Sequence, residues 1–285
     1  MKKAQTYATV LKEGKSRARK QGLEESAVEL LMLEFSGLSA TNMYLCFHDE
    51  MPEDKRLAFF EALHEYLDEG RPVQYIIGHV NFYGYKINVD EHVLIPRFET
   101  EELVQNVLDI ADEMFPGKEE IKVLDIGTGS GCIAIALKME EPRFLVHATD
   151  ISNRALEVAK TNAYNLGADL VFHTGDLFSG IQGEKFDIIV SNPPYIPESE
   201  TIPEIIAKNE PDVALYGGTD GLIYHKRILD QANEYIDKRF LIAFEHGFDK
   251  ARELRDYAQR KFPECLVFTK KDMQGRDRMT FIEKR

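Results

Sequence analysis

The chain has 285 residues, of which 44% are hydrophobic and 29% charged, and its formal net charge at pH 7 is −14. This composition is typical of a globular protein with one large or two ordinary domains, and every stretch of about 18 residues contains a charge, which argues against a membrane span. Because a strongly acidic protein repels phosphate backbones, we expect no general binding to nucleic acid.

The three cysteines, Cys46, Cys132 and Cys265, lie far apart, without the paired spacing of a zinc site or a disulfide framework. The N-terminus lacks the apolar segment of a secretory signal. We therefore expect a cytoplasmic protein that holds no metal, contacts no membrane and is a monomer.

Residues 1–77 are predicted to form a small helical bundle. The clearest helix spans residues 52–69, since Pro52 suits a first turn and Gly70 follows the end. Its apolar residues recur at helical spacing, at Leu57, Phe60, Leu63 and Leu67. A second apolar segment, residues 30–35, precedes Gly37. We interpret the aromatic residues of this region as core residues.

Residues 78–96 are predicted to be a β-hairpin that connects two domains. Apolar residues flank Gly84 on both sides, with Val80, Phe82 and Tyr83 before it and Tyr85, Ile87 and Val89 after it. Residues 93–100 then lead into a predicted helix that ends at Met114.

From residue 97 to residue 285, predicted strands and helices alternate. The strands are residues 121–126, 144–149, 170–173, 187–191, 240–244, 266–269 and 279–282. Helical patterns cover residues 132–138, 153–166, 222–235 and 249–261. Such alternation predicts an α/β domain with a doubly wound, mostly parallel seven-stranded sheet and helices on both faces.

A glycine-rich turn joins the first of these strands to its helix. Asp125 and Ile126 are followed by Gly127, Thr128, Gly129, Ser130 and Gly131. Glycines allow a tight turn and a close approach of backbone N–H groups to a ligand. Gly129, Gly131 and Ala134 also satisfy a relaxed dinucleotide fingerprint, and a turn without any cofactor stays open as an alternative.

Acidic residues end the next two strands. Asp150 lies 19 residues after Gly131, where a carboxylate can accept hydrogen bonds from both hydroxyls of a ribose. Asp176 can accept from an adenine amino group, and Leu177 can supply an apolar wall for the base. Each aspartate can also be a helix cap or a turn residue.

The run Asn192-Pro193-Pro194-Tyr195 follows the fourth strand, at the sheet edge where open α/β sheets bind ligands. An asparagine, two prolines and an aromatic residue can present acceptor oxygens and a flat ring to a small planar group. A simple Pro-Pro turn is the alternative.

Taken together, these motifs resemble those of S-adenosylmethionine-dependent class I methyltransferases, and in particular those of the HemK/PrmC family. Residues 93–100, residues 210–215 with Gly217, Gly218 and residues 220–222, and residues 275–278 also resemble family segments, so the resemblance covers nearly the whole chain. It implies a Rossmann-like fold and methylation of the glutamine side-chain nitrogen (N5) in the Gly-Gly-Gln motif of peptide chain release factors. Phe98 departs from the proline that is usual in the family.

The resemblance also implies roles for individual residues. The cofactor S-adenosylmethionine is expected to bind Gly127, Thr128, Gly129, Ser130, Gly131, Asp150, Asp176, Leu177 and Asn192. The glutamine is expected to bind Asn192, Pro193, Pro194 and Tyr195, of which Asn192, Pro193 and Tyr195 are the candidate catalytic residues. Asn192 and the Pro193 carbonyl would accept the two amide N–H groups, and Tyr195 would pack on the amide. No residue is assigned as a general base.

Three other functions stay open from the sequence. An adenine N6 methyltransferase acting on DNA or RNA would meet the same planar amine, but it needs a positive groove that this acidic chain lacks. A nicotinamide oxidoreductase leaves the Asn-Pro-Pro-Tyr loop without a role, and a binding module would keep the fold alone. We interpret His246 as structural. We interpret Glu198, Glu200 and Glu204 as a solvated loop, with contact to a basic partner as the alternative. The helical bundle would dock the release factor.

Overall fold

The computed structural model describes residues 5–285, which form two compact units. The first unit runs to Gly78 and also includes Pro203–Asn209. The second unit comprises His79–Ile202 and Glu210–Arg285. Residues 1–4 of the predicted helical bundle lie outside the described residues. The hairpin that the sequence suggests as a connector belongs to the second unit.

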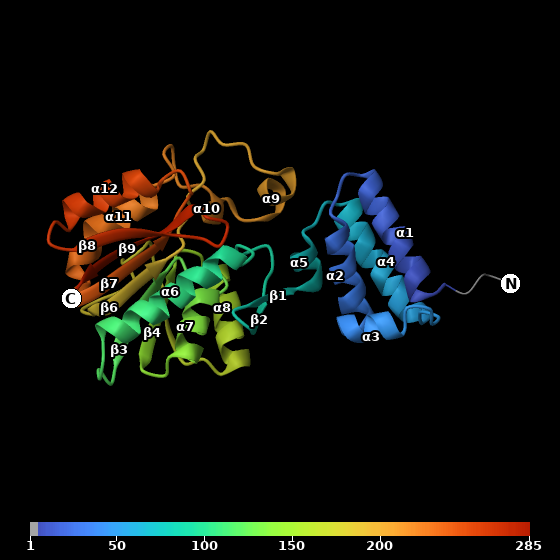
Figure 1. The fold of residues 1–285 in the computed structure, drawn as a ribbon, viewed down its shortest axis with the longest axis horizontal. Coiled ribbons are helices and arrows are strands. Elements are labelled where there is room, and N and C mark those ends of the chain that lie inside the picture. Colours follow the sequence, from blue (N-terminus) through green and yellow to red (C-terminus); the bar gives the residue numbers. More distant parts are fainter. Residues whose placement is uncertain (1–4) are drawn as a thin grey trace. The chain divides into compact units, whose positions relative to one another are not determined.

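The first unit is a bundle of short helices around one apolar core (Figure 1). Its helices are α1 (Tyr7–Lys20), α2 (Glu25–Ser36), α3 (Ala40–Leu45), α4 (Glu53–Leu67) and α5 (Val73–Ile77). Gly14 brings α1 close to its neighbours, because a Cβ there would lie 2.8 Å from Val28 Cγ1 and 3.1 Å from Phe59 Cζ. In α4, Phe59, Leu63 and Leu67 are buried, whereas Leu57 is 62% exposed.

A short helix from far along the chain completes this unit. Helix α9 (Glu204–Asn209) places Ile205 against the core of the bundle. Asn209 Nδ2 donates a hydrogen bond of 3.0 Å to the Gly70 carbonyl. Glu204 is therefore helical, and the expectation of a loop at this residue was wrong, although its side chain is exposed and pairs with Lys208.

The second unit begins with the predicted hairpin, formed by β1 (His79–Phe82) and β2 (Tyr85–Asn88). The two turn residues, Tyr83 and Gly84, have φ angles of 50° and 83°, as the twist of a two-residue hairpin requires. Asn162 fixes the hairpin to the rest of the unit. Its side chain is fully buried, accepts from the Asn88 N–H at 2.8 Å and donates to the carbonyls of Asn88 and Ser130 at 3.0 and 2.9 Å.

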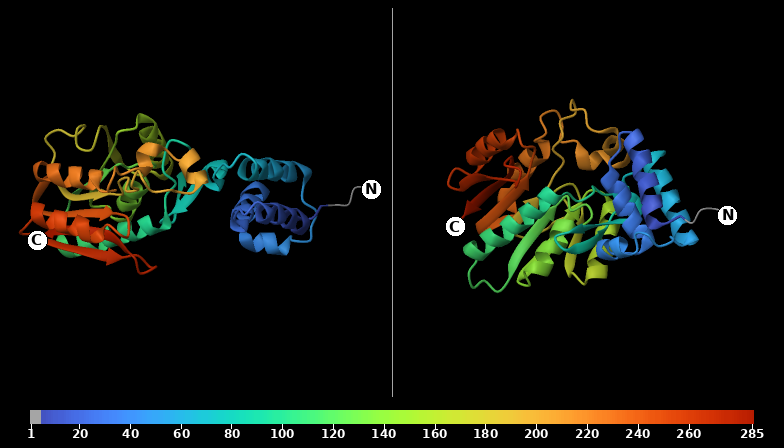
Figure 2. Two further views of the ribbon diagram at one scale, coloured as in Figure 1. Left: turned by 90° about the horizontal axis from the view of Figure 1, so that it is seen from above. Right: turned by 45° about the vertical axis from the view of Figure 1, so that its right-hand side comes forward.

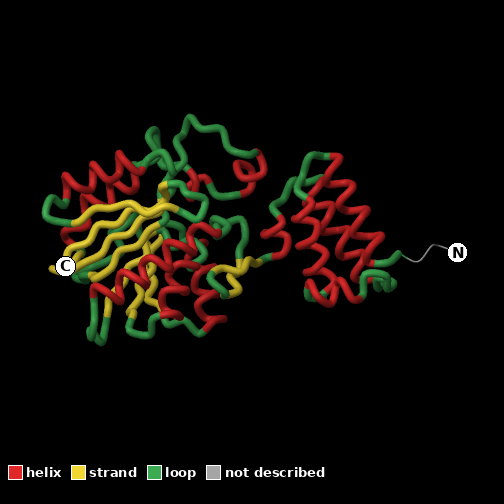
Figure 3. Tube along the Cα trace, in the orientation of Figure 1, coloured by secondary structure: helices red, strands yellow, loops and turns green. Residues whose placement is uncertain are grey.

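A seven-stranded sheet forms the centre of the second unit, in the order β5-β4-β3-β6-β7-β9-β8 (Figure 3). Its strands are β3 (Ile121–Ile126), β4 (Phe144–Asp150), β5 (Leu170–Thr174), β6 (Phe186–Ser191), β7 (Ile236–Glu245), β8 (Leu266–Lys271) and β9 (Asp277–Lys284). The first five in this order are parallel, and β9 is antiparallel to both β7 and β8. The predicted mostly parallel seven-stranded sheet is confirmed.

Helices cover both faces of this sheet, as Figures 1 and 2 show. On one side lie α6 (Phe98–Met114), α7 (Cys132–Glu140) and α8 (Asn153–Leu166), and on the other lie α11 (Ile223–Gln231) and α12 (Ala251–Lys261). The predicted helix over residues 222–235 ends earlier, because a 3-10 turn at Ala232–Glu234 leads directly into β7. A short helix, α10 (Asp212–Leu215), lies in the long connection after β6.

Candidate active site

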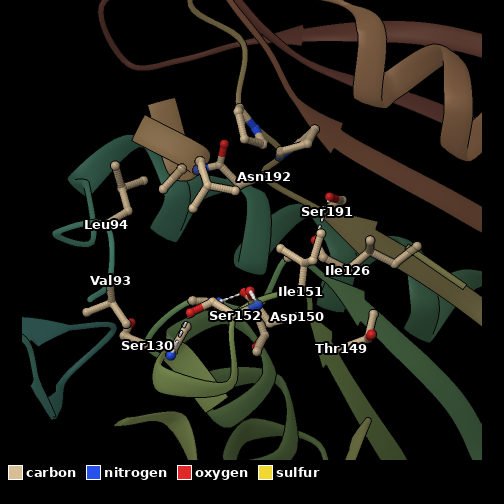
Figure 4. A pocket seen from close by; sticks show the side chains of 18 of the residues that line it. Val93, Leu94, Ile126, Ser130, Thr149, Asp150, Ile151, Ser152, Ser191 and Asn192 are labelled. Carbon is tan, nitrogen blue, oxygen red and sulfur yellow. Dashed lines mark hydrogen bonds between the residues drawn. The ribbon is translucent and has the colours of Figure 1, made fainter. Parts of the chain in front are cut away.

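A cavity opens at the carboxyl ends of the parallel strands, next to the point where the strand order reverses between β3 and β6. Open α/β sheets bind their ligands at this position because loops on either side of the reversal diverge. The cavity lies wholly within the second unit. In Figure 4, Ser130, Asp150 and Ser152 lie on one side of it, Asn192 on the opposite side, and Val93 and Leu94 beside them.

The glycine-rich turn after β3 forms the floor of the cavity. Gly127, Gly129 and Gly131 have φ angles of 73°, 54° and 82°, a backbone region that glycine enters without steric cost. At Gly131 the close approach of α8 adds a second requirement, since a Cβ there would lie 3.1 Å from Ala159 Cβ. These glycines therefore allow the backbone of the turn to line the cavity directly.

Asp125 supports this turn from below. Its side chain is fully buried and does not line the cavity. Oδ2 accepts a hydrogen bond of 2.6 Å from the Thr128 hydroxyl, whereas Oδ1 has no partner within residues 5–285. The pKa of this carboxyl is raised to about 7, mainly by burial, with a smaller contribution from the nearby charge of Asp150, and the Thr128 hydrogen bond counteracts the rise.

Asp150, the last residue of β4, joins the turn to the second strand. Its Oδ2 accepts a hydrogen bond of 2.9 Å from the Gly129 N–H, and its Oδ1 accepts one of 2.9 Å from the Ser152 N–H. Burial raises the pKa of this carboxyl, while the two backbone donors counteract the rise. The carboxylate is thus fixed at the cavity wall, with remaining lone pairs on both oxygens.

Asp176 and Leu177, which follow β5, line the same cavity. Leu177 is held at φ 54°, which is uncommon for a residue with a side chain, and its side chain is buried. Asp176 Oδ2 accepts a hydrogen bond of 2.6 Å from Arg227 Nη2 on α11. Arg227 and Tyr224 line the cavity as well. The sequence analysis did not identify these two, because they lie within an ordinary helical pattern.

The Asn-Pro-Pro-Tyr loop follows β6 on the opposite side of the cavity. Asn192, Pro193 and Pro194 line the cavity, and Tyr195 does not. Asn192 Nδ2 donates a hydrogen bond of 3.1 Å to Thr100 Oγ1. The Tyr195 hydroxyl donates one of 3.2 Å to Glu245 Oε1, and burial, followed by the negative charge of Glu245, raises the pKa of the phenol. The loop therefore divides into a part that lines the cavity and a half-buried tyrosine that is anchored to Glu245.

Glycines from the following connection fit closely behind this loop. A Cβ at Gly217 would lie 2.5 Å from the Pro194 carbonyl oxygen, and a Cβ at Gly221 would lie 2.4 Å from the Tyr195 carbonyl oxygen. Gly221 also has a φ angle of 73°. Only glycine fits at these two positions without a shift of the loop.

The segment that enters α6 is held by a buried glutamate. Glu210 is 5% exposed, and its Oε1 lies 2.5 Å from Arg97 Nη2. Its Oε2 accepts a hydrogen bond of 3.1 Å from the Ile95 N–H. Phe98, the departure noted in the sequence, is 60% exposed at the first residue of α6. Glu210 therefore holds this entry segment in place through Ile95 and Arg97, without a proline at residue 98.

Curated relatives match the chain along nearly its whole length, and family models match two parts of it. Residues 9–78 match the model of the PrmC N-terminal domain, and residues 91–210 match that of the methyltransferase small domain. A release factor glutamine methyltransferase from Bacillus anthracis is 39% identical over 277 residues, which is 96% of this chain and 97% of the relative. One from Bacillus subtilis is 40% identical over 277 residues, or 96% of each chain. The chain belongs to the release factor glutamine methyltransferase family.

Solved structures share the fold at much lower sequence identity. A methyltransferase from Pyrococcus furiosus is 18% identical, with a TM-score of 0.51, and covers 70% of this chain and 88% of its own. A T. thermophilus 16S rRNA methyltransferase in complex with AdoMet and guanosine is 14% identical, with a TM-score of 0.51. It covers 73% of this chain and 50% of its own. These likenesses confirm the predicted class I methyltransferase fold.

For this family member, the structure places nearly all of the sequence-predicted site residues around one cavity. Among the predicted cofactor residues, those that line it are Gly127, Thr128, Gly129, Ser130, Asp150, Asp176, Leu177 and Asn192. Gly131 lies at the start of α7 next to them. Thr100 and Glu245 form a hydrogen-bonded pair beside Asn192, and the sequence analysis did not identify Thr100 because only the fold brings α6, β6 and β7 together. Within residues 5–285, no three metal-ligating side chains gather, and no helix has the length and apolar character to cross a membrane.

Proposed function

We propose that this chain transfers a methyl group from S-adenosylmethionine to N5 of the glutamine in the Gly-Gly-Gln motif of peptide chain release factors. The names of relatives that match almost the whole chain support this activity. One geometric observation carries the proposal. Asn192, Pro193 and Pro194 line one side of a cavity whose other side presents the Asp150 carboxylate, which is hydrogen-bonded to a glycine-rich turn.

The residues of the cavity suit S-adenosylmethionine. We assign Asp150 to the two ribose hydroxyls, because its oxygens keep lone pairs free beside the backbone donors they accept from. Asp176 would accept from the adenine amino group through the oxygen that Arg227 does not occupy, and Leu177 would cover the base. The backbone of residues 127–131 would contact the methionine part. When bound, the sulfonium supplies an electrophilic methyl group.

The Asn-Pro-Pro loop would hold the glutamine amide. An amide nitrogen is a poor nucleophile, because its lone pair is delocalised into the carbonyl. The Asn192 side-chain oxygen and the Pro193 carbonyl would each accept one amide N–H. Neither proline has an N–H that would compete for these acceptors. Catalysis would come from alignment, which can lower a barrier by several kcal/mol.

Tyr195 has a different position from the other residues of the motif. Its side chain does not line the cavity, and its hydroxyl is bound to Glu245. We therefore assign Tyr195 to anchoring the loop, in place of the packing against the amide that the sequence suggested. No general base is assigned, since the methylated amide nitrogen can release its proton to water.

The helical unit would dock the release factor. A small methyl acceptor would need no separate bundle, and residues 9–78 match the model of the PrmC N-terminal domain. Within this unit, Tyr44 and Leu45 on α3 are 80% and 77% exposed, and they are suitable contacts for a protein partner.

Labelled-methyl transfer to purified release factor tests the proposal. Wild-type factor should accept the label, with the mass increase mapped to the glutamine of its Gly-Gly-Gln motif. A factor with that glutamine replaced by alanine should accept none. An adenine-containing RNA oligonucleotide serves as the alternative acceptor. Transfer to the oligonucleotide but not to the factor would replace this proposal with the adenine methyltransferase alternative.

A further inference from the structure

We propose that Thr100 and Glu245 are positioning residues that hold the Asn192 side-chain amide with its carbonyl oxygen free for the acceptor. The inference rests on the proposed function, because it concerns the asparagine that would bind the glutamine amide. It assigns a task to two buried residues outside the Asn-Pro-Pro-Tyr motif.

The three side chains come from three different elements and form one chain of hydrogen bonds. Thr100 lies in the first turn of α6, Asn192 follows β6, and Glu245 is the last residue of β7. Thr100 Oγ1 donates to Glu245 Oε2 at 2.7 Å, and Asn192 Nδ2 donates to Thr100 Oγ1 at 3.1 Å. Thr100 and Glu245 are 2% and 1% exposed, so water does not compete for these bonds.

The orientation of the asparagine amide follows from the number of protons available. The Thr100 hydroxyl has a single proton, and it donates this proton to Glu245 Oε2. The hydroxyl oxygen can then only accept, and of the two ends of the Asn192 amide only the NH₂ group can donate to it. The amide oxygen is thereby directed away from Thr100, and the hydrogen bond that the Asn192 side chain makes within residues 5–285 is through its Nδ2 alone.

This orientation of the Asn192 amide must be enforced, because the two ends of an asparagine amide have nearly the same shape. If the amide rotated by half a turn, its NH₂ group would face the NH₂ group of the glutamine, and two donors would oppose each other. The hydrogen bonds among Glu245, Thr100 and Asn192 exclude the rotated amide. They therefore keep the Asn192 oxygen in position to accept the N–H of the substrate glutamine.

Glu245 is itself fixed from several directions. Its Oε1 accepts from the Tyr195 hydroxyl, and its backbone carbonyl accepts from His225 Nε2 at 2.8 Å. Burial raises the pKa of this carboxyl, and the charge of Glu99 adds to the rise. The Thr100 and Tyr195 hydroxyls and the positive charge of Arg278 oppose it and stabilise the ionised form. The carboxylate thus links Tyr195 and, through Thr100, Asn192, at both ends of the motif.

The first test replaces Thr100 by valine, which keeps the shape of the side chain and removes its hydroxyl. In Thr100→Val, kcat for methyl transfer to the release factor should fall about 10- to 100-fold, while the Kd for S-adenosylmethionine changes less than about 2-fold. Thr100→Ser keeps the hydroxyl and should restore kcat to within about 3-fold of wild type. Glu245→Gln should also lower kcat without weakening cofactor binding, because its NH₂ group can donate to Thr100 and reverse the bonds.

Thr280→Val is the matched control. Thr280 is a fully buried threonine of β9 whose hydroxyl is bonded to His246 Nε2 at 2.8 Å, and it does not line the cavity. Both valine variants lose one buried hydroxyl, so we expect similar decreases in melting temperature, with kcat retained to within about 2-fold only in the control. Equal losses of kcat in Thr100→Val and Thr280→Val would show that Thr100 has only a structural role.

A double-mutant cycle tests whether Thr100 acts through Asn192. The Kd of the release factor is measured with S-adenosylhomocysteine bound. Thr100→Val should weaken binding about 3- to 10-fold in the wild-type background and have no further effect in the Asn192→Ala background. An equal effect in both backgrounds, or wild-type kcat in Thr100→Val, overturns the inference. Absence of methyl transfer by the wild-type enzyme would instead overturn the proposed function.

Discussion

Arg227 Nη2 on α11 lies 2.6 Å from Asp176 Oδ2 in the loop after β5, and both residues line the cavity. The pair is partly exposed, with side-chain exposures of 39% and 45%, so it contributes less than about 1 kcal/mol to folding. Its position suggests a role in binding, because it fixes one carboxylate oxygen and leaves the other for the adenine. Arg227→Ala should weaken S-adenosylmethionine binding about 3- to 10-fold, by calorimetry, with little change in melting temperature. A lower melting temperature with unchanged affinity would contradict this role.

Asp150 should contribute more to cofactor affinity than Asp176. In Asp150→Asn the amide oxygen can accept from the Gly129 or the Ser152 N–H but not from both, and the NH₂ group cannot accept from a ribose hydroxyl. We expect the Kd for S-adenosylmethionine to rise about 10- to 100-fold. Asp169→Asn is a suitable control, since Asp169 is exposed and lies outside the cavity. Equal Kd values for S-adenosylmethionine in the two variants would show that Asp150 does not bind the cofactor.

Asn192 should affect the chemical step and not the cofactor. Asn192→Ala removes the side-chain acceptor for the glutamine amide, so methyl transfer should be abolished while the Kd for S-adenosylmethionine stays within about tenfold of wild type. Rates of label incorporation and calorimetric titration of the cofactor measure the two effects separately. Full activity in this variant would rule out the proposed binding of the amide.

Gly217 should control the position of the Asn-Pro-Pro-Tyr loop through space alone. Its φ angle is not in the left-handed region, so alanine is acceptable for the backbone, but the new Cβ would lie 2.5 Å from the Pro194 carbonyl oxygen. The loop must move to relieve this contact, and small displacements of a positioning group are costly. In Gly217→Ala we expect kcat to fall at least about tenfold with cofactor affinity nearly unchanged. Unchanged kcat would show that the loop adjusts freely.

The strands and the cavity-lining motifs could be predicted because their patterns are local. The glycine turn, Asp150 and Asp176 each follow an apolar strand, and parallel strands bring their ends to one edge. Three features could not be predicted. Arg227 lies within an ordinary helix, Thr100 meets Glu245 across 145 residues of sequence, and α9 packs with the helical unit although it follows the Asn-Pro-Pro-Tyr loop in the chain. Each depends on tertiary contacts that periodicity does not encode.

Asp125 should make the protein less stable as the pH rises from 5 to 8. Burial raises the pKa of this carboxyl from an ordinary 3.8 to about 7 in the folded protein, which therefore holds the proton more tightly than the unfolded chain does. The resulting stabilisation is complete below about pH 3.8 and is lost as the pH rises through about 7. Between pH 5 and pH 8 the loss amounts to about 2–3 kcal/mol.

In Asp125→Asn, residue 125 binds no proton in either state and therefore no longer contributes to the pH dependence of the free energy of unfolding. Asp150 and Glu245 also have raised pKa values and act in the same direction, so the wild-type protein alone cannot isolate Asp125. The difference between wild type and Asp125→Asn can, because the other groups are common to both. Melting temperatures at pH 5, 6.5 and 8 should decrease more steeply with pH for wild type than for the variant, because only wild type must ionise a carboxyl that has one oxygen without a hydrogen-bond partner. Parallel pH curves for the two proteins would mean that Asp125 does not titrate in this range.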